Sequence, residues 1–374
     1  MLISIYFLMS FLFCFILLFK TKKLDISLSF SNSIILCYIM QLCLGAIGIL
    51  PFALLSVPIN LLSLAFVYNI ITVFLFIRFH KTKELQLYHF DKFDIANFFI
   101  MLAFISIVFL RVFSADIKLA YFNTDIANHF DFAMSIIRTG KLNTMYFSAL
   151  NNAVFIELLS PIFSGVNSYK SMIIAETVSH FLSGMIFYIL ISYKKRSKLF
   201  HYISPVLMIL YFIGWPLYEY VLGGFVYWGM GVTLFLFGLY LLYLYEDFPN
   251  KHKKLSALLL TVMYCIGVCY VLFVPYTLAL YLLCYIKISM NTSPIFKVTK
   301  RMIKIILIIG IISSVFLIGF LYLYFGDFAI FKTFLNHDGG IHKDFYRDFI
   351  YFVPFICYFA SQCKKNSNCN LYIS

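Results

Sequence analysis

The chain has 374 residues, of which 63% are hydrophobic, 20% are aromatic and only 12% are charged. A soluble domain carries about 25% charged residues, and here the deficit extends along the whole chain, which leaves no segment for a water-soluble catalytic domain. The net charge of +13 sits in short Lys and Arg clusters between apolar runs, as in cytoplasmic loops of membrane proteins, and this argues against a nucleic-acid partner.

Apolar runs of about 20 residues recur along the chain, and each can cross about 30 Å of hydrocarbon as a helix. They predict an all-α membrane bundle of about eleven helices that forms a single domain over residues 1–374. Near Pro275 two spans meet with little loop, so one long kinked helix with a re-entrant piece is an alternative there. The predicted spans are 2–19, 30–48, 58–77, 94–113, 171–193, 199–214, 223–245, 255–270, 272–287, 305–325 and 349–361.

The Lys and Arg clusters also predict the orientation of the chain. With the N-terminus outside, the predicted inner loops contain most of the 29 basic residues, and the alternation holds at every loop. We therefore expect a multi-pass protein of the plasma or inner membrane with a polar, cytoplasmic C-terminal tail at 362–374. The nine cysteines fall in spans or near inner loops, so no disulfide framework is expected.

Two predicted outer segments, residues 114–170 and 326–348, are too long to be turns. Long loops in a compact domain usually carry function or are disordered. Both segments are rich in Phe, Tyr and Ile, which argues against disorder. We therefore expect functional side chains in these two extracytoplasmic loops.

The sharpest signal in the first outer loop is the stretch 123–131, directly after the fourth span. Thr124 or Asp125 can cap the start of a helix, and Gly140 can end it. Asp125 and His129 are four residues apart, so that they share one face of this helix.

An apolar stripe beside this pair predicts that the helix lies along the outer membrane surface. In that position Asp125 and His129 would face the edge of a membrane cleft. The alternative is that Asp125 only caps the helix and His129 faces water. The residues of the predicted stripe are Ile126, Phe130, Ala133 and Ile137.

The chemistry that suits this arrangement is group transfer from a lipid-anchored donor. The Asp125 carboxylate could take the proton of an acceptor hydroxyl as a general base. The His129 imidazole could orient that carboxylate or bind a phosphate oxygen. Arg138, Lys141 or an ion could stabilise the charge on the leaving phosphate.

The stretches 125–130 and 136–142 resemble the outer loop of the GT-C superfamily of membrane glycosyltransferases and of capsule or O-antigen repeat-unit polymerases. The resemblance implies a polyprenyl-phosphate-linked donor on the outer face, with Asp125 as base and His129 beside it. In GT-C enzymes that loop usually follows the first span, and here it follows the fourth. A polymerase-like relative therefore fits better than a standard member.

Glu176 and His180 lie four residues apart inside the fifth predicted span, together with Thr177. Charged groups at membrane depth are costly and usually face the bundle interior or a wet cavity. We favour a polar lining of the outer cleft that binds substrate. A transporter's proton relay and a buried structural hydrogen bond are the alternatives.

The segment 215–231 contains both tryptophans of the chain, Trp215 and Trp228, and several glycines. The favoured interpretation is an interfacial aromatic belt with glycines for close helix packing. The alternative is a wall that stacks on a sugar, with Glu219 as its hydrogen-bond partner.

The second outer loop contains several polar side chains within twelve residues. His337, Asp338 and His342 could hold a divalent metal ion, although their spacing matches no standard site. Arg347 could instead grip a pyrophosphate, together with Lys343. A plain solvated loop is the alternative.

These signals together predict a glycosyltransferase or repeat-unit polymerase of a cell-surface polysaccharide. Its expected partners are the bilayer, a polyprenyl-phosphate-linked glycan and other polysaccharide-assembly membrane proteins. The sequence has no Gly-x-x-x-x-Gly-Lys phosphate loop, which argues against nucleotide hydrolysis. A flippase or transporter of lipid-linked oligosaccharide and a non-enzymatic membrane partner are the alternatives.

Overall fold

In the structure, a computed structural model, all regular secondary structure among the described residues is helical. The chain divides into two units, Met1–Met302 and Ile303–Ser374, and every element named below belongs to the first unit. The predicted spans 2–19, 305–325 and 349–361 and most of 30–48 lie outside the described residues. Those residues are 39, 49–53, 55–80, 91–118, 124–140, 148–192, 198–214, 216–217, 220, 226–247, 252–270, 273–290, 303–304 and 307.

The described helices follow the predicted spans to within a few residues. The first long loop contains two further helices, α5 and α6, outside the predicted spans. The helices are α3 (Leu61–His80), α4 (Lys92–Phe113), α5 (Thr124–Thr139), α6 (Ser148–Leu159), α7 (Tyr169–Ser192), α8 (Lys198–Ile213), α10 (Val226–Asp247), α11 (His252–Tyr270) and α12 (Val274–Met290), with a short 3₁₀ turn, η2, at Gly165–Asn167.

Three described segments are long and apolar enough to cross a membrane: Lys92–Phe113, Gly165–Ser192 and Trp228–Asp247. Shorter apolar segments occur in α3, α6, α8, α11 and α12. These segments confirm the predicted all-helical class and the multi-pass membrane assignment. The total of about eleven spans stays a prediction.

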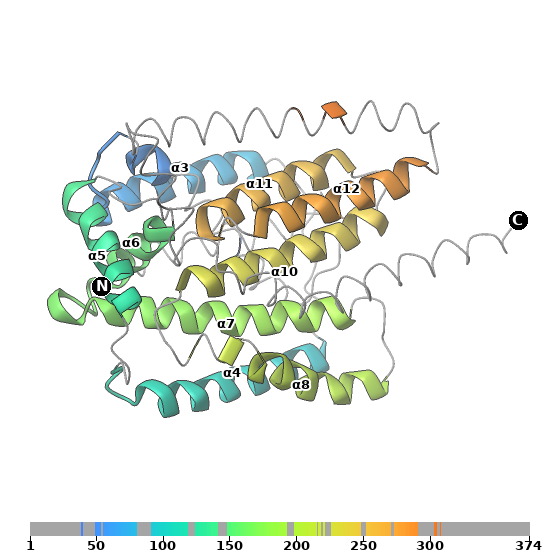
Figure 1. Cartoon of the computed structure of the whole chain (residues 1–374), viewed down its shortest axis with the longest axis horizontal. Coiled ribbons are helices and arrows are strands. Elements are labelled where there is room, and N and C mark those ends of the chain that lie inside the picture. Colours follow the sequence, from blue (N-terminus) through green and yellow to red (C-terminus); the bar gives the residue numbers. More distant parts are fainter. Residues whose placement is uncertain are drawn as a thin grey trace, which may run out of the picture. The chain divides into compact units, whose positions relative to one another are not determined.

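The helices alternate in direction as successive membrane spans must. α4 and α8 run the same way, because Asn97 contacts Ser204 near their starts and Phe104 contacts Phe212 near the end of α8. α7 runs against α4, since Tyr188 interacts with Asn97 near the start of α4. Figure 1 shows these helices with their axes roughly aligned.

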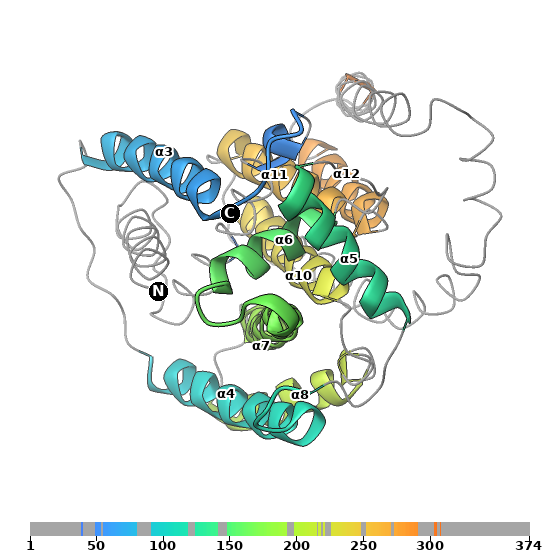
Figure 2. The ribbon, with the colours of Figure 1, turned by 90° about the vertical axis from the view of Figure 1, so that its left-hand side faces the viewer.

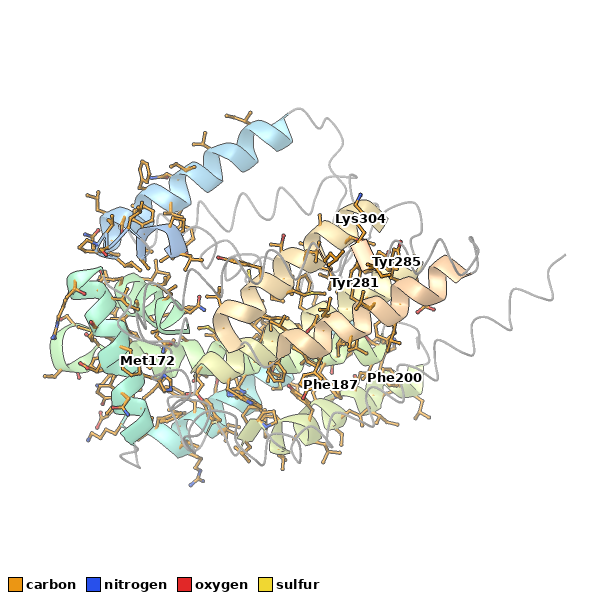
Figure 3. The ribbon with its side chains drawn as sticks, turned by 45° about the horizontal axis from the view of Figure 1, so that its top comes forward. Met172, Phe187, Phe200, Tyr281, Tyr285 and Lys304 are labelled. Atoms are coloured by element: carbon orange, nitrogen blue, oxygen red, sulfur yellow. The ribbon has the colours of Figure 1, made fainter. Side chains whose placement is uncertain are left out.

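α11 and α12 form an antiparallel pair. The Tyr281 hydroxyl donates to Ser256 Oγ at 3.1 Å, and a Cβ on Gly267 would meet the Val274 side chain at 3.5 Å. Figure 3 labels Tyr281 on α12. The alternative of a single long kinked helix near Pro275 is therefore wrong, because the chain reverses direction between the two helices.

α7 lies at the centre of the described helices and contacts α4, α6, α8 and α10 (Figure 2). Its residues are buried over most of their length. Phe187 of α7, labelled in Figure 3, stacks on Tyr211 of α8 with ring centroids 4.6 Å apart. Side chains on α7 therefore face protein rather than lipid.

Apolar side chains on the outer faces of α3, α4 and α8 remain exposed. Examples are Phe66, Ile107 and Leu199, which are 60%, 60% and 69% exposed. Exposed apolar surface on this scale is unusual for a soluble monomer. Helices that contact lipid expose apolar side chains of this kind.

α5 and α6 fill the end of the bundle where α7 begins (Figure 1). α5 packs on α6, and α6 also contacts α3, α7, α10 and α11. α5 ends at Gly140, whose φ is +70° and whose N–H donates to the Ile136 carbonyl at 2.8 Å. The predicted helix and its glycine stop are both confirmed.

Candidate functional site

Glu176 and His180 form a buried pair on α7. Their side chains are 0% and 1% exposed, and His180 Nε2 lies 3.8 Å from Glu176 Oε1. The pair is possible because residues four apart share a helix face. Since α7 is covered by other helices, this face points into the protein, as the interpretation of a polar lining requires.

Aromatic rings enclose the His180 imidazole. The ring centroids of Tyr220, Trp228 and Phe212 lie 5.3, 5.8 and 5.9 Å from that of His180. These rings come from α8, α10 and the connection between them. Gly229 of α10 packs closely against the imidazole, since a Cβ there would lie 3.4 Å from Nε2.

Trp228 therefore does not belong to an interfacial belt. Its side chain is only 7% exposed and lies against His180. The belt interpretation favoured from the sequence is wrong for this residue, because α10 turns it toward α7. Trp215 and Glu219 lie outside the described residues.

Hydrogen bonds hold the walls of this enclosure in place. The hydroxyls of Thr177 and Tyr220 lie 2.8 Å apart, and Phe113 meets the Tyr220 ring edge-on at 5.2 Å. Thr233 of α10 donates to the Ser179 carbonyl of α7 at 2.8 Å. The groups around His180 are thus fixed by contacts from α4, α7 and α10.

α6 adds two buried amides at the same end of the bundle. Asn151 Nδ2 donates to Cys269 Sγ at 3.0 Å, which joins α6 to α11. Asn152 is fully buried, and its Oδ1 and Nδ2 make no hydrogen bond with any described residue. An unpartnered buried polar group costs about 1–3 kcal/mol, and such groups are few in a folded protein.

Two further buried polar groups lie on the first half of α7, Ser171 and His180, the second of which also faces Glu176 at 3.8 Å. The Ser171 hydroxyl and both ring nitrogens of His180 are buried without a hydrogen bond among the described residues. Sequence analysis missed Asn152, Ser171, Tyr220 and Phe212. Of these, only Asn152 carried a signal, since it belongs to an Asn-Asn pair inside an apolar run.

α5 buries a face that overlaps the predicted one at Ile126 and Ala133 but is turned toward His129. Its buried residues are spaced so that His129, 6% exposed, lies inside the buried face rather than beside it. The predicted members Phe130 and Ile137 are only half-buried. The buried face differs from the predicted stripe because α5 packs on α6 instead of lying freely on a membrane surface. The buried residues are Ile126, His129, Ala133 and Ile136.

The remaining predicted site residues are only partly placed. Asp125 lies in the first turn of α5, but its side chain is outside the described part of the structure. Arg138 is exposed in the last turn of α5. Outside the described residues lie Lys141, His337, Asp338, His342 and Arg347, so the predicted metal and pyrophosphate sites stay predictions.

Within the described ranges no group of three or more His, Cys, Asp or Glu side chains could hold a metal ion. The described polar groups at this end suit hydrogen bonding instead. They comprise two amides, an imidazole, a carboxylate and the hydroxyls of Ser171, Thr177 and Tyr220, flanked by aromatic rings. Such a set fits a ligand rich in hydroxyl groups.

The other charged side chains at this end of the bundle lie closer to the protein surface than Glu176 and His180 do. Lys118 Nζ and Asp116 Oδ2 are 2.9 Å apart on the exposed turn after α4. The hydrogen bond from Lys118 lowers the pKa of Asp116, and the same contact raises the pKa of Lys118. Burial raises the pKa of Glu157 on α6, and a hydrogen bond from the Leu61 N–H opposes this.

A second polar cluster lies at the opposite end of α4, α7 and α8. Asn97 Nδ2 donates to Ser204 Oγ at 3.0 Å, and Tyr188 interacts with Asn97. Hydrogen bonds of this kind join helices within membranes. We assign this cluster to helix packing.

Comparison of the chain with protein-family models, curated proteins and solved structures gives no match.

Proposed function

We propose that the chain is a glycosyltransferase or repeat-unit polymerase that assembles a capsular or O-antigen polysaccharide. Its donor is a polyprenyl-phosphate-linked sugar, bound at the end of the bundle that α5 and α6 cover. The observation that carries the proposal is the fully buried pair of Glu176 and His180, enclosed by aromatic rings at that end.

The enclosure has the chemistry that a sugar needs. Aromatic faces pack against the C–H faces of a sugar ring, as Trp228 and Tyr220 could here. The Glu176 carboxylate accepts hydrogen bonds from hydroxyls, and the His180 imidazole can donate or accept. Because neighbouring helices exclude water, these hydrogen bonds would also orient the ring.

The reaction itself is assigned to α5. The acceptor hydroxyl oxygen attacks the anomeric carbon of the donor, and its proton passes to the Asp125 carboxylate. The bond from that carbon to the donor phosphate breaks, and the phosphate oxygen keeps the electron pair. Arg138, which is exposed at the end of α5, and Lys141 would stabilise the developing charge, with His129 holding the base in position.

Asp125→Asn tests this assignment in cells whose only copy of the protein is the variant. We expect loss of the polysaccharide or a marked shortening of its chains, because the amide cannot accept the proton. Asp131→Asn is the matched control, since Asp131 is an exposed aspartate on the same helix. Normal polysaccharide with Asp125→Asn would remove the proposed base.

A transporter or flippase is the second candidate. It is favoured by the complete burial of Glu176 and His180 within a helix long enough to cross a membrane, because buried ionisable pairs often relay protons in transporters. Reconstitution into vesicles separates the two functions. A flippase moves the labelled lipid across the bilayer, whereas a transferase forms a new glycosidic bond.

A further inference from the structure

The turn that follows α4, residues 114–118, has a strained backbone. Ser114 and Ile117 have φ values of +58° and +54°, in the left-handed region that residues other than glycine adopt uncommonly. For Ile117 this conformation is a genuine outlier, because its side chain branches at Cβ. Such residues persist only where their surroundings hold them in place, and they cluster at functional sites.

Three hydrogen bonds hold this turn. The Ile117 N–H donates to the Ser114 carbonyl at 3.3 Å, and the Lys118 N–H donates to the Phe113 carbonyl at 2.7 Å. The third bond comes from another helix. The hydroxyl of Tyr169, the first residue of α7, donates to the Ile117 carbonyl at 3.0 Å. Tyr169 thus ties the residue with the strained backbone to α7.

The turn adjoins the proposed site on both of its sides. It begins after Phe113, which is 1% exposed and meets the ring of Tyr220 edge-on at 5.2 Å. Beyond Lys118 the chain continues to α5, which carries Asp125 in its first turn. The end of α4 and the start of α7 lie at the end of the bundle that α5 covers (Figure 1). The bond from Tyr169 therefore fixes the point from which the chain runs toward the proposed base.

We propose that Tyr169 is a positioning residue for glycosyl transfer: its hydroxyl holds the turn 114–118 in the strained conformation and so places Asp125. The inference rests on the proposed function and adds a residue that acts through the turn rather than on the substrate. A glycine at position 117 would adopt the left-handed conformation without strain. With isoleucine there, the turn depends on the bond from α7, and loss of this bond lets the turn relax.

Tyr169→Phe removes the hydroxyl and keeps the ring. In vesicles with a labelled polyprenyl-linked donor, we expect kcat for transfer to fall about fivefold and KM to change little, because the base is displaced while the donor still binds. Tyr281→Phe is the matched control. The Tyr281 hydroxyl also bonds a neighbouring helix, at 3.1 Å to Ser256 Oγ, but near the start of α11 and away from α5.

Ile117→Gly separates the role of the hydrogen bond from simple packing of the Tyr169 ring. Because glycine removes the strain, the double variant of Tyr169→Phe and Ile117→Gly is expected to recover most of the lost transfer. Equal losses in Tyr169→Phe and Tyr281→Phe, or no recovery in the double variant, would overturn the proposal.

Amide hydrogen exchange of the full-length protein in lipid nanodiscs tests the turn independently of transfer. We expect Tyr169→Phe to speed exchange at Ile117, Lys118 and the first turn of α5 about fivefold, and the double variant to slow it again. Faster exchange in a protein that transfers no sugar would show that Tyr169 holds the turn and that the proposed reaction is wrong. Exchange or transfer that Tyr169→Phe leaves unchanged would remove the positioning role and leave the reaction standing.

Discussion

Gly140 lies directly against the backbone of Val57. A Cβ on Gly140 would be only 2.5 Å from the Val57 carbonyl carbon, and the φ of Gly140 is +70°. Only glycine meets both conditions without strain. This contact joins the end of α5 to the segment that leads into α3, and so fixes the helix that carries Asp125.

Gly140→Ala is therefore expected to destabilise the protein by at least about 2 kcal/mol, because left-handed strain of about 1–2 kcal/mol adds to a backbone clash. Gly165→Ala is the control, since Gly165 also has a positive φ, +59°, but nothing lies within 4 Å of its added Cβ. Thermal unfolding in detergent compares the two. Equal losses would show that the Val57 contact contributes nothing.

Glu157→Gln should raise stability near pH 7 and leave it unchanged at low pH. Burial raises the pKa of Glu157 in the folded chain above its ordinary value of 4.5. The stability that this shift contributes is present below pH 4.5 and is lost as the pH rises through the folded pKa. Glutamine stays neutral and still accepts from the Leu61 N–H. Melting temperatures at both pH values measure the difference, and a destabilised variant near pH 7 would contradict the burial argument.

Gly229→Ala and Gly267→Ala form a matched pair within helices. Their added Cβ atoms would meet His180 Nε2 at 3.4 Å and the Val274 side chain at 3.5 Å. Both variants gain helix propensity, about 1 kcal/mol each, so neither should unfold the protein. Both distances are ordinary van der Waals contacts, but only the Gly229→Ala methyl lies beside the imidazole, and we expect it alone to lower glycosyl transfer several-fold. Equal transfer rates in the two variants would mean that His180 does not touch the ligand.

Ser204→Ala should destabilise the contact between α4 and α8 by about 1 kcal/mol, because it leaves the buried Asn97 amide without its 3.0 Å partner. Thr261→Ala is the control, since the exposed Thr261 hydroxyl bonds only to the Ala257 carbonyl of its own helix. Unfolding in mixed micelles reports both values. A loss no greater than that of the control would show that the bond is dispensable.

Apolar runs were sufficient to predict the described spanning helices, because a helix needs about 20 apolar residues to cross the hydrocarbon. The stop at Gly140 was predictable too, since glycine favours the left-handed conformation. α6 was missed as a helix because its 12 residues are too few to span. Its burial depends on five neighbouring helices, which the local sequence does not encode.

The site was predictable only where charge stood out against an apolar background. Glu176 and His180 did so, and the structure brings them together. Asn152, Phe212 and Tyr220 did not, because their importance comes from helices that are distant in sequence. His129 was found, but the face of α5 that it occupies is set by packing on α6.

The most direct measurement of the central claim uses purified protein in vesicles with a polyprenyl-linked donor that carries a labelled sugar. We predict that the intact protein and Asp131→Asn join the label to an acceptor glycan, and that Asp125→Asn does not. Movement of the labelled lipid across the bilayer without any new glycosidic bond, at the same rate in Asp125→Asn, would contradict the account.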